Sequence, residues 1–235
     1  MVSVGKTHVG KVRKNNEDYY YVDGRGLHVL ADGMGGHLAG DVASQTAVDY
    51  VRSNFYDHNS GDVSVHLKDI VEAVNKHIYS LASSSEQYKD MGTTLIVAYV
   101  DDDKKMFYAH VGDSRLYLYR QGNLQRLTKD HSLVEELLSS GAITEREAQQ
   151  HPQKNIITRA IGVNEHVQVD TGCEVLKPED LFLICTDGLS NMIADEHLKH
   201  ILNQGEDLDV LADRLINEAN KNGGSDNITV VLGKV

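Results

Sequence analysis

The chain has 235 residues, and its 23 Lys and Arg against 35 Asp and Glu give a formal net charge of −12 at pH 7. Hydrophobic residues make up 40% and charged residues 25%, as in ordinary globular proteins, so the composition excludes disorder, collagen and coiled coil. A net negative charge repels nucleic acid and anionic membranes, and no cluster of Lys and Arg in the sequence would offset that repulsion. We therefore expect neither nucleic acid nor a membrane as a partner.

No linker rich in Pro, Gly or Ser divides the chain, so we expect a single domain over residues 1–235. Residues 1–14 lack the apolar core of a secretory signal, and the longest apolar runs fall short of the ~20 residues that span a bilayer. Cys173 and Cys185 match no zinc or redox spacing. These features favour a cytoplasmic protein, and we expect a monomer.

The first part of the chain predicts two strands and then two helices. Apolar, β-branched and aromatic residues predict strands over Tyr19–Val22 and Leu27–Ala31. Apolar residues then recur at helical spacing from Ala43 to Phe55 and from Leu67 to Leu81, which predicts two amphipathic helices in succession.

The middle of the chain predicts consecutive strands and then a helical excursion. The strands are expected over Thr93–Val100, Met106–Val111 and Leu116–Tyr119. Ser132 and Thr144 are each followed three residues later by Glu, the pattern of a capping box, so two short helices are expected between residues 132 and 150. This excursion lies between two strand-rich halves and is suited to cover a site.

The last part returns to strands and helices. The predicted strands are Val167–Val175, Leu181–Cys185 and Ile228–Leu232, and the predicted helices are Asp195–Leu202 and Leu208–Ala219. Strands that follow one another without a helix between them disfavour a doubly wound parallel sheet. The pattern favours an α+β fold of stacked antiparallel sheets covered by pairs of helices.

Aspartates recur at the ends of the predicted strands. Asp32-Gly33 and Asp187-Gly188 each follow an apolar strand, Asp113 follows another, and Asp226 comes directly before one. Each alone is more often a turn residue or a helix cap, but strands that share one core would bring all of them together. Crowded carboxylates must either take up protons or bind cations, and we favour cations. A donor set of oxygens alone selects Mg²⁺ or Mn²⁺ over zinc or copper.

A mixed-charge segment near the N-terminus contains Arg13, Glu17 and Asp18. The planar guanidinium suits bidentate binding of phosphate, and the acidic pair suits the hydration shell of a metal. On local grounds alone, a solvated turn is the better interpretation. Cysteine-based phosphatase chemistry is excluded, because the position that must hold arginine is Glu179 after Cys173 and Asn191 after Cys185.

The motifs in chain order resemble those of the metal-dependent protein serine/threonine phosphatases of type 2C, in the bacterial single-domain branch. The matching segments are Arg13 with Glu17-Asp18, Asp32-Gly33-Met34-Gly35-Gly36-His37, Met91-Gly92-Thr93-Thr94, Gly112-Asp113-Ser114-Arg115, Asp130-His131-Ser132, Thr186-Asp187-Gly188-Leu189 and Ser225-Asp226-Asn227-Ile228-Thr229-Val230. The resemblance implies a β-sandwich of two antiparallel sheets flanked by pairs of helices (αββα layers).

The resemblance also implies a metal site of two Mg²⁺ or Mn²⁺ ions. The aspartate that matches Asp32 bridges both ions, and those that match Asp187 and Asp226 bind the first. The carbonyl group that matches Gly33 binds the second ion, to which the pair Glu17-Asp18 contributes through water. The sequence thereby predicts Asp18, Asp32, Gly33, Asp187 and Asp226 as a metal centre.

Further roles follow from the same resemblance. Asp113, together with Asp187, would bind a weaker third ion, and Arg13 would hold the substrate phosphate. Animal members carry a histidine where this chain has Met34, whose thioether cannot donate a proton. The remaining candidates for the acid are His37 and a metal-bound water, of which we favour the water. Residues 132–161 correspond to the variable segment called the flap, where substrate selection is expected to reside.

The implied reaction is hydrolysis of phosphoserine and phosphothreonine in proteins, without a phosphoenzyme. Two metals about 3.5–4 Å apart activate a shared water and offset charge on the phosphoryl group. The expected substrates are proteins phosphorylated by a cognate serine/threonine kinase, and the kinase itself is a further candidate. The alternatives are a catalytically silent relative that binds phosphoproteins and a two-metal phosphoesterase that acts on nucleotides or nucleic acid.

Overall fold

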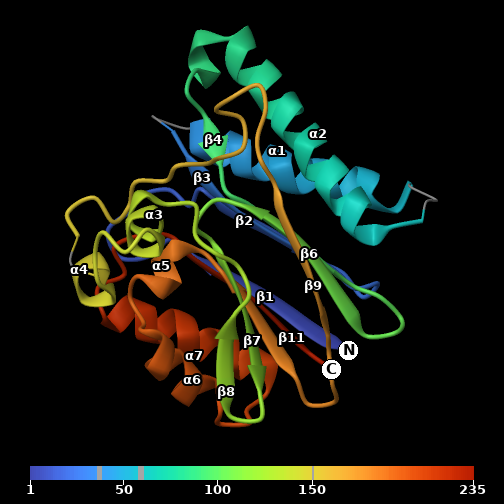
Figure 1. The fold of residues 1–235 in the computed structure, drawn as a ribbon, viewed down its shortest axis with the longest axis vertical. Coiled ribbons are helices and arrows are strands. Elements are labelled where there is room, and N and C mark those ends of the chain that lie inside the picture. The colour runs from blue at the N-terminus through green and yellow to red at the C-terminus, as the bar shows by residue number, and fades with distance from the viewer. Residues whose placement is uncertain (36–38, 58–60, 150) are drawn as a thin grey trace.

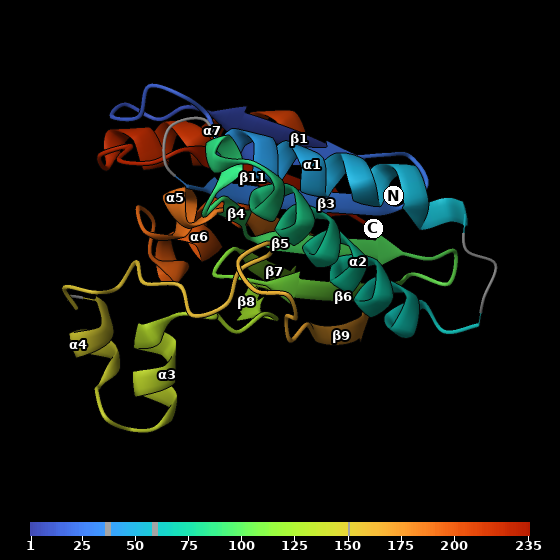
Figure 2. The ribbon, with the colours of Figure 1, turned by 90° about the horizontal axis from the view of Figure 1, so that it is seen from above.

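The computed structural model describes residues 1–35, 39–57, 61–149 and 151–235. In it two antiparallel sheets are stacked face to face, and helices cover the outer face of each (Figures 1 and 2). This arrangement confirms the predicted α+β class and its αββα layers.

The first sheet has the strand order β2-β3-β5-β6-β9, with the short β4 paired to the end of β3. Helices α1 and α2 lie side by side on its outer face (Figure 2). The bounds are β2 Asp18–Val22, β3 Leu27–Met34, β4 Gly92–Thr93, β5 Leu95–Val100, β6 Lys105–Val111, β9 Asp170–Val175, α1 Ala39–Asn54 and α2 Val63–Ser84, with short 3₁₀ turns at Phe55–Asp57 and Glu86–Tyr88.

The second sheet has the order β1-β11-β10-β7-β8, and helices α5, α6 and α7 pack on its side of the sandwich (Figure 1). The bounds are β1 Val2–His8, β7 Arg115–Arg120, β8 Asn123–Arg126, β10 Leu181–Cys185, β11 Ile228–Lys234, α5 Asp187–Ser190, α6 Asp195–Leu202 and α7 Leu208–Lys221.

Burial on both faces explains the continuous apolar runs of the central strands. Along β3, Leu27 and Val29 pack against the helix layer, whereas Leu30 packs between the two sheets against residues such as Phe182. Each such side chain stabilises the fold by about 1.5–3 kcal/mol relative to an exposed one. The strands therefore hold their ends, and the residues that follow them, at defined places.

The flap, residues 132–161, projects from the sandwich and carries α3 (Leu133–Ser139) and α4 (Glu145–Gln149) (Figure 2). The predicted capping box at Thr144 is complete, because Glu147 N–H donates to its hydroxyl and Glu147 Oε2 accepts from its N–H. At Ser132 only half of the box forms: Glu135 N–H donates to the Ser132 hydroxyl, while the Glu135 carboxylate pairs with Arg126.

Several elements differ from the sequence-based expectation. Strands β1 and β8 and the one-turn helix α5 are not predicted, and β9 begins at Asp170 rather than at Val167. The predicted strand Thr93–Val100 is divided, because Thr93 pairs with Gly33 and Ile161 instead of continuing the ladder of β5.

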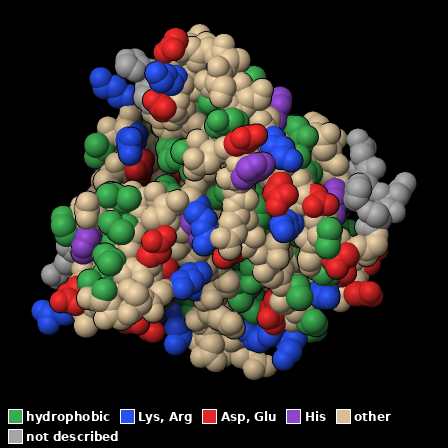
Figure 3. All heavy atoms as spheres, turned by 45° about the horizontal axis from the view of Figure 1, so that its top comes forward, with side chains coloured by type: hydrophobic (Ala, Val, Ile, Leu, Met, Phe, Trp, Pro, Cys, Tyr) green, Lys and Arg blue, Asp and Glu red, His purple; other side chains and the backbone are tan. Residues whose placement is uncertain are grey.

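The face in Figure 3 presents acidic and basic side chains interspersed rather than separated. Among the described helices, none combines the length and the apolarity that crossing a bilayer requires.

Candidate metal centre

Asp18 and Asp32 face each other on neighbouring strands, since the β2–β3 register pairs these two positions. Asp18 is buried, and its Oδ2 accepts hydrogen bonds from the hydroxyls of Thr186 at 2.9 Å and Thr229 at 2.6 Å. Its other oxygen, Oδ1, is buried and has no hydrogen-bond partner. A buried carboxylate oxygen without a donor is costly unless a cation satisfies it, directly or through water.

Two threonines fix the backbone of Asp32. Its N–H donates to Thr94 Oγ1 at 3.0 Å, and its carbonyl oxygen accepts from Thr93 Oγ1 and Thr94 N–H, both at 2.8 Å. The expected position of Asp32 just after a strand is corrected, because β3 continues to Met34 and Asp32 lies within it. The aspartate is thereby held by strand pairing and not by a free turn.

Gly33 lies where two backbone segments meet. A Cβ there would stand 2.1 Å from the carbonyl oxygen of Gly40 and 2.6 Å from that of Glu17. Gly33 N–H donates to the same Glu17 oxygen at 3.0 Å. Only glycine fits this position, so its carbonyl group keeps a fixed place beside Asp32.

Asp187 and Asp226 come from the ends of adjacent strands, β10 and β11. Asp187 is the first residue of α5, and Asn191 Nδ2 donates to its Oδ2 at 2.9 Å. A Cβ on Gly188 would stand 1.9 Å from the carbonyl oxygen of Asn227, so α5 packs directly against the loop that carries Asp226. The segments that carry Asp187 and Asp226 are thus adjacent in space although they are far apart in sequence.

Asp113 follows β6 and is 8% exposed. The preceding Gly112 adopts a φ of +111°, and a Cβ there would lie 2.6 Å from the Thr94 side chain. Thr94 also binds Asp32, so one threonine contacts the segments that carry both aspartates.

The pKa values show that these carboxylates share one electrostatic environment. Burial, followed by the charges of Asp18, Asp187, Asp113 and Asp226, raises the pKa of Asp32 well above its ordinary value. Burial likewise raises the pKa of Asp18 to about 7, of Asp113 to about 8 and of Asp187 to about 6. All of them cannot be ionised together at neutral pH unless a cation compensates. An all-oxygen donor set with this charge fits Mg²⁺ or Mn²⁺.

Arg13 lies beside this group of aspartates and donates from Nη2 to Asp226 Oδ2 at 2.7 Å. The same bond is the main cause that raises the pKa of Arg13. The side chain of Asn227 holds the N-terminal segment that contains Arg13. Its Nδ2 donates to the carbonyl oxygens of Val9 and Asn15, and its Oδ1 accepts from Glu17 N–H. The fold therefore places a guanidinium next to the acidic cluster.

Three supporting residues received no role from the sequence. Thr186 and Thr229 bind the Asp18 carboxylate, and Asn227 anchors the loop of Arg13. Thr186 directly precedes Asp187, Asn227 directly follows Asp226, and Thr229 is the second residue of β11. Each would have been found by asking which polar side chain at a buried strand end faces inward. His37 lies outside the described residues. The side chain of Met34 extends toward Gly92, where an added Cβ would lie 2.9 Å from Met34 Cε.

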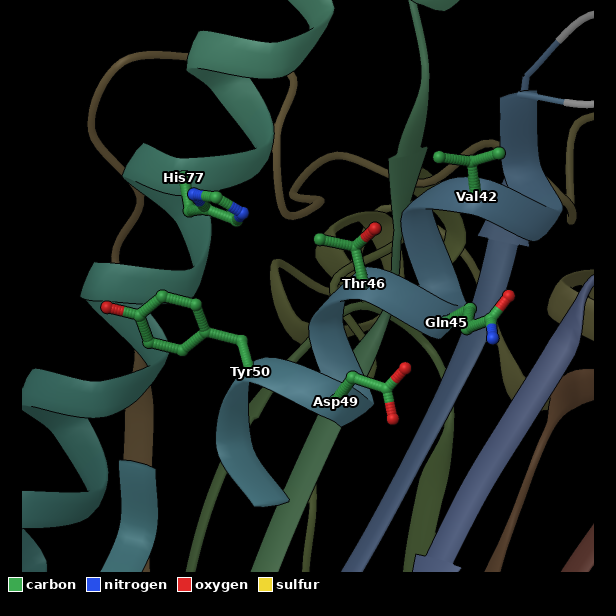
Figure 4. Close-up of a pocket in the computed structure, with 6 residues that line it drawn as sticks. All are labelled: Val42, Gln45, Thr46, Asp49, Tyr50 and His77. Atoms are coloured by element: carbon green, nitrogen blue, oxygen red, sulfur yellow. The ribbon is translucent and has the colours of Figure 1, made fainter. Parts of the chain in front are cut away.

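A groove of about 300 Å³ lies elsewhere, on the outer helix layer (Figure 4). Val42, Gln45, Thr46, Asp49 and Tyr50 line it from α1, and His77 faces Tyr50 from α2. None of the predicted site residues that the structure describes lines it. The groove has one carboxylate and no convergent basic groups, so the metal centre remains the candidate for chemistry.

Comparisons with known proteins identify the family to which this chain belongs. The family model described as protein phosphatase 2C matches residues 4–232. The protein phosphatase PhpP of Streptococcus pneumoniae is 42% identical over 233 residues, covering 96% of this chain and 94% of that protein. These matches show that the chain belongs to the protein phosphatase 2C family.

Solved structures support the same conclusion. The serine/threonine phosphatase PstP/Ppp of Mycobacterium tuberculosis has a TM-score of 0.93 and 37% identity and covers 100% of this chain and 98% of that one. The catalytic domain of PstP in complex with 2 manganese ions has a TM-score of 0.90 and 36% identity, covering 99% and 97%. The predicted family and the predicted class of enzyme, a serine/threonine protein phosphatase, are confirmed.

Proposed function

We propose that the chain hydrolyses phosphoserine and phosphothreonine in proteins by means of a water activated by two divalent metal ions, without a phosphoenzyme. The observation that carries the proposal is the unpartnered, buried Oδ1 of Asp18 within a group of carboxylates whose pKa values are raised. The relative solved with manganese ions supports the choice of Mg²⁺ or Mn²⁺. When bound, these ions supply the nucleophile and offset charge on the phosphoryl group.

The chain's own residues would hold the ions as follows. Asp32 would bridge both ions, with Asp187 and Asp226 on the first and the Gly33 carbonyl on the second. Asp18 would contribute through water, which would satisfy its buried and unpartnered Oδ1. Thr93 and Thr94 keep Asp32 oriented, so the bridging carboxylate requires little reorganisation.

A weaker third ion would lie between Asp113 and Asp187. The charge of Asp187 is the largest cause, after burial, of the raised pKa of Asp113, which supports the proximity of these carboxylates. A cation between them would allow both to ionise.

Arg13 would bind the substrate phosphate. Its guanidinium already donates to the Asp226 carboxylate, and a phosphate oxygen of the substrate would take the place of that anionic acceptor. Met34 cannot protonate the departing serine or threonine oxygen. Protonation of that oxygen therefore belongs to another group, with His37 and a metal-bound water as the candidates, of which we favour the water.

We also propose the domain organisation, the cellular location and the substrates of this protein. We expect a monomeric cytoplasmic protein with one catalytic domain over residues 1–235, in which the flap contributes to substrate choice. Its substrates would be proteins phosphorylated by a cognate serine/threonine kinase, which this enzyme would oppose, and the kinase itself would be among them.

The test is hydrolysis of a phosphothreonine peptide in Mn²⁺, repeated with a chelator and with Asp32→Asn. The expected result is activity that requires the metal and is lost in the variant. Tight peptide binding without hydrolysis would instead indicate a silent phosphoprotein-binding relative. Preferential hydrolysis of single-stranded DNA or a cyclic nucleotide under the same conditions would indicate a different phosphoesterase.

A further inference from the structure

A pair of threonines on neighbouring strands connects Asp18 to the surface of the protein. Thr7 on β1 and Thr229 on β11 lie directly opposite each other in the antiparallel ladder. Their hydroxyl oxygens are 2.7 Å apart, and the Thr229 hydroxyl also donates to Asp18 Oδ2 at 2.6 Å. Thr229 is fully buried, whereas Thr7 is exposed. The pair therefore links an exposed side chain to a buried carboxylate.

Asn16 makes the next hydrogen bond of this chain. Its Nδ2 donates to Thr7 Oγ1 at 2.8 Å, and its Oδ1 accepts from the backbone N–H of Asp18 at 3.2 Å. The two contacts agree on the orientation of the amide, because the backbone N–H requires the oxygen and leaves the nitrogen for Thr7. Together with the bonds of Thr7 and Thr229, they form a ring that begins at the backbone of Asp18 and ends at its carboxylate.

The chemistry of the two ends fixes the direction of each hydrogen bond in the chain. The amide nitrogen of Asn16 can only donate, and an ionised carboxylate can only accept. The single hydroxyl proton of Thr229 goes to Asp18, so Thr229 must accept from Thr7. Thr7 in turn accepts from Asn16. Because each hydroxyl accepts one bond and donates the next, the chain is polarised towards the carboxylate, which strengthens its last bond.

The chain also determines which oxygen of Asp18 is left for an ion. Oδ2 accepts from the hydroxyls of both Thr229 and Thr186. Oδ1 is buried and, within the part of the chain that the structure describes, has no hydrogen-bond partner. A rotation of the carboxylate would exchange the two oxygens, and both hydroxyl bonds oppose that rotation. Oδ1 is therefore kept as the oxygen through which Asp18 would reach the water of an ion.

We propose that Thr7 is a positioning residue of the metal centre, which acts through Thr229 to hold the Asp18 carboxylate with Oδ1 free for the water of a bound ion. Thr7 lies outside the group of carboxylates and would touch neither the ion nor the substrate. The proposal rests on the proposed function, because it takes Asp18 as a residue that contributes to ion binding. An exposed hydroxyl on an edge strand thereby changes the affinity for an ion that it does not contact.

The test is calorimetric titration with Mn²⁺ of the parent protein, Thr7→Val, Thr7→Ser and the matched control Thr171→Val. Thr171 is likewise exposed and lies on an edge strand, β9. Thr7→Val keeps the shape of the side chain and removes the hydroxyl, so Mn²⁺ binding is expected to weaken about 2- to 10-fold, the effect of one lost hydrogen bond. Thr7→Ser keeps the hydroxyl and should bind Mn²⁺ as the parent protein does.

A double-mutant cycle shows whether Thr7 acts through Thr229. In Thr229→Val the chain is already interrupted next to Asp18, so adding Thr7→Val should not weaken Mn²⁺ binding further. Chemical denaturation in chelator measures the stability of every variant. A purely structural role of Thr7 would lower that stability and leave the affinity for Mn²⁺ unchanged. If Thr7→Val does not fold, Thr7→Ala removes the same hydroxyl and takes its place.

Equal Mn²⁺ affinities in Thr7→Val and the parent protein would overturn the proposal, and so would an equal loss of affinity in Thr7→Ser or in Thr171→Val. An effect of Thr7→Val that persists in the Thr229→Val background would exclude action through Thr229 and would also overturn it. Failure of the parent protein to hydrolyse phosphopeptides would overturn the proposed function instead. The Mn²⁺ titration needs no turnover, so it decides on Thr7 in either case.

Discussion

Arg13 and Asp226 are joined by a hydrogen-bonded ion pair of 2.7 Å, although they lie 213 positions apart in sequence. Their side chains are 53% and 32% exposed, so solvent screens the pair and its contribution to stability is only about 0–1 kcal/mol. A phosphate dianion can therefore replace the carboxylate at small cost. The pair holds the guanidinium beside the acidic cluster, where we propose that it binds the substrate phosphate.

Arg13→Ala is expected to raise KM for a phosphothreonine peptide about tenfold or more, because the guanidinium binds phosphate in the ground state and the transition state alike. Steady-state kinetics in Mn²⁺ measure the effect, with Lys14→Ala as the control for loss of a neighbouring charge. A defect in kcat with unchanged KM would contradict this role of Arg13.

Asp187→Asn and Asp226→Asn should each lower kcat about 10²–10⁴-fold, because each would remove a proposed metal ligand worth several kcal/mol in the transition state. The fold should survive, since both side chains are only partly buried and neither belongs to the apolar core. Turnover, bound Mn²⁺ and melting temperature are measured together, with the turn variant Asp103→Asn as the control. Full activity at full metal occupancy would reject these residues as ligands.

The metal-free protein should lose stability as the pH rises through the range in which Asp18 ionises. Burial, followed by the charges of Asp187 and Asp226, raises the pKa of Asp18 to about 7, against an ordinary value of about 3.9. The stability that protonated Asp18 contributes is complete below about pH 4 and is lost as the pH approaches about 7. Mn²⁺ should therefore raise the melting temperature more at about pH 8 than at about pH 5.

Buried histidines require a reference variant in that experiment. Burial lowers the pKa of His28 to about 4, and this change makes the fold lose stability as the pH falls below about 6.5. The prediction therefore concerns the difference between the parent protein and Asp18→Asn, both in chelator. If the two melting profiles run parallel from about pH 4 to pH 8, the raised pKa of Asp18 is wrong.

Thr229→Val should weaken Mn²⁺ binding about 10- to 100-fold, because Thr229 donates at 2.6 Å to the Asp18 carboxylate and orients it. Calorimetric titration with Mn²⁺ measures the change, and chemical denaturation in chelator measures stability. Thr128→Val is the matched control, since Thr128 is also buried and its hydroxyl binds the backbone N–H of Leu116 away from Asp18. Equal Mn²⁺ affinities in both variants would exclude an orienting role.

The sequence predicted the layers because the central strands and the helices carry regular patterns. Leu27–Ala31 and Leu181–Cys185 are apolar on both faces, and α2 repeats Leu67, Val71, Val74 and Ile78 at helical spacing. Strand β1 escaped prediction because it is a half-buried edge strand interrupted by Gly5. That glycine is required by the ring of Tyr20, which would lie 2.2 Å from a Cβ there.

The sequence predicted only part of the candidate site, because only some of its residues belong to a regular local pattern. Asp32 and Asp187 each come after a run of apolar residues, a pattern that local sequence reveals, whereas the contacts of Asp18 with Thr186 and Thr229 depend on tertiary packing. The hydrogen bond between Thr7 and Thr229 also could not be foreseen, because it depends on the pairing of β1 with β11 and β1 was not predicted.

The backbone bonds that close the base of the flap have an evolutionary consequence. Ser132 pairs with Ile157 and Ile161 with Thr93 through main-chain groups, which any amino acid except proline provides. The segment between these closures is therefore free to diverge in length and composition without disturbing the catalytic framework. The flap, to which we assign a part in substrate choice, can therefore be exchanged as a cassette while the strands that carry the aspartates keep their places.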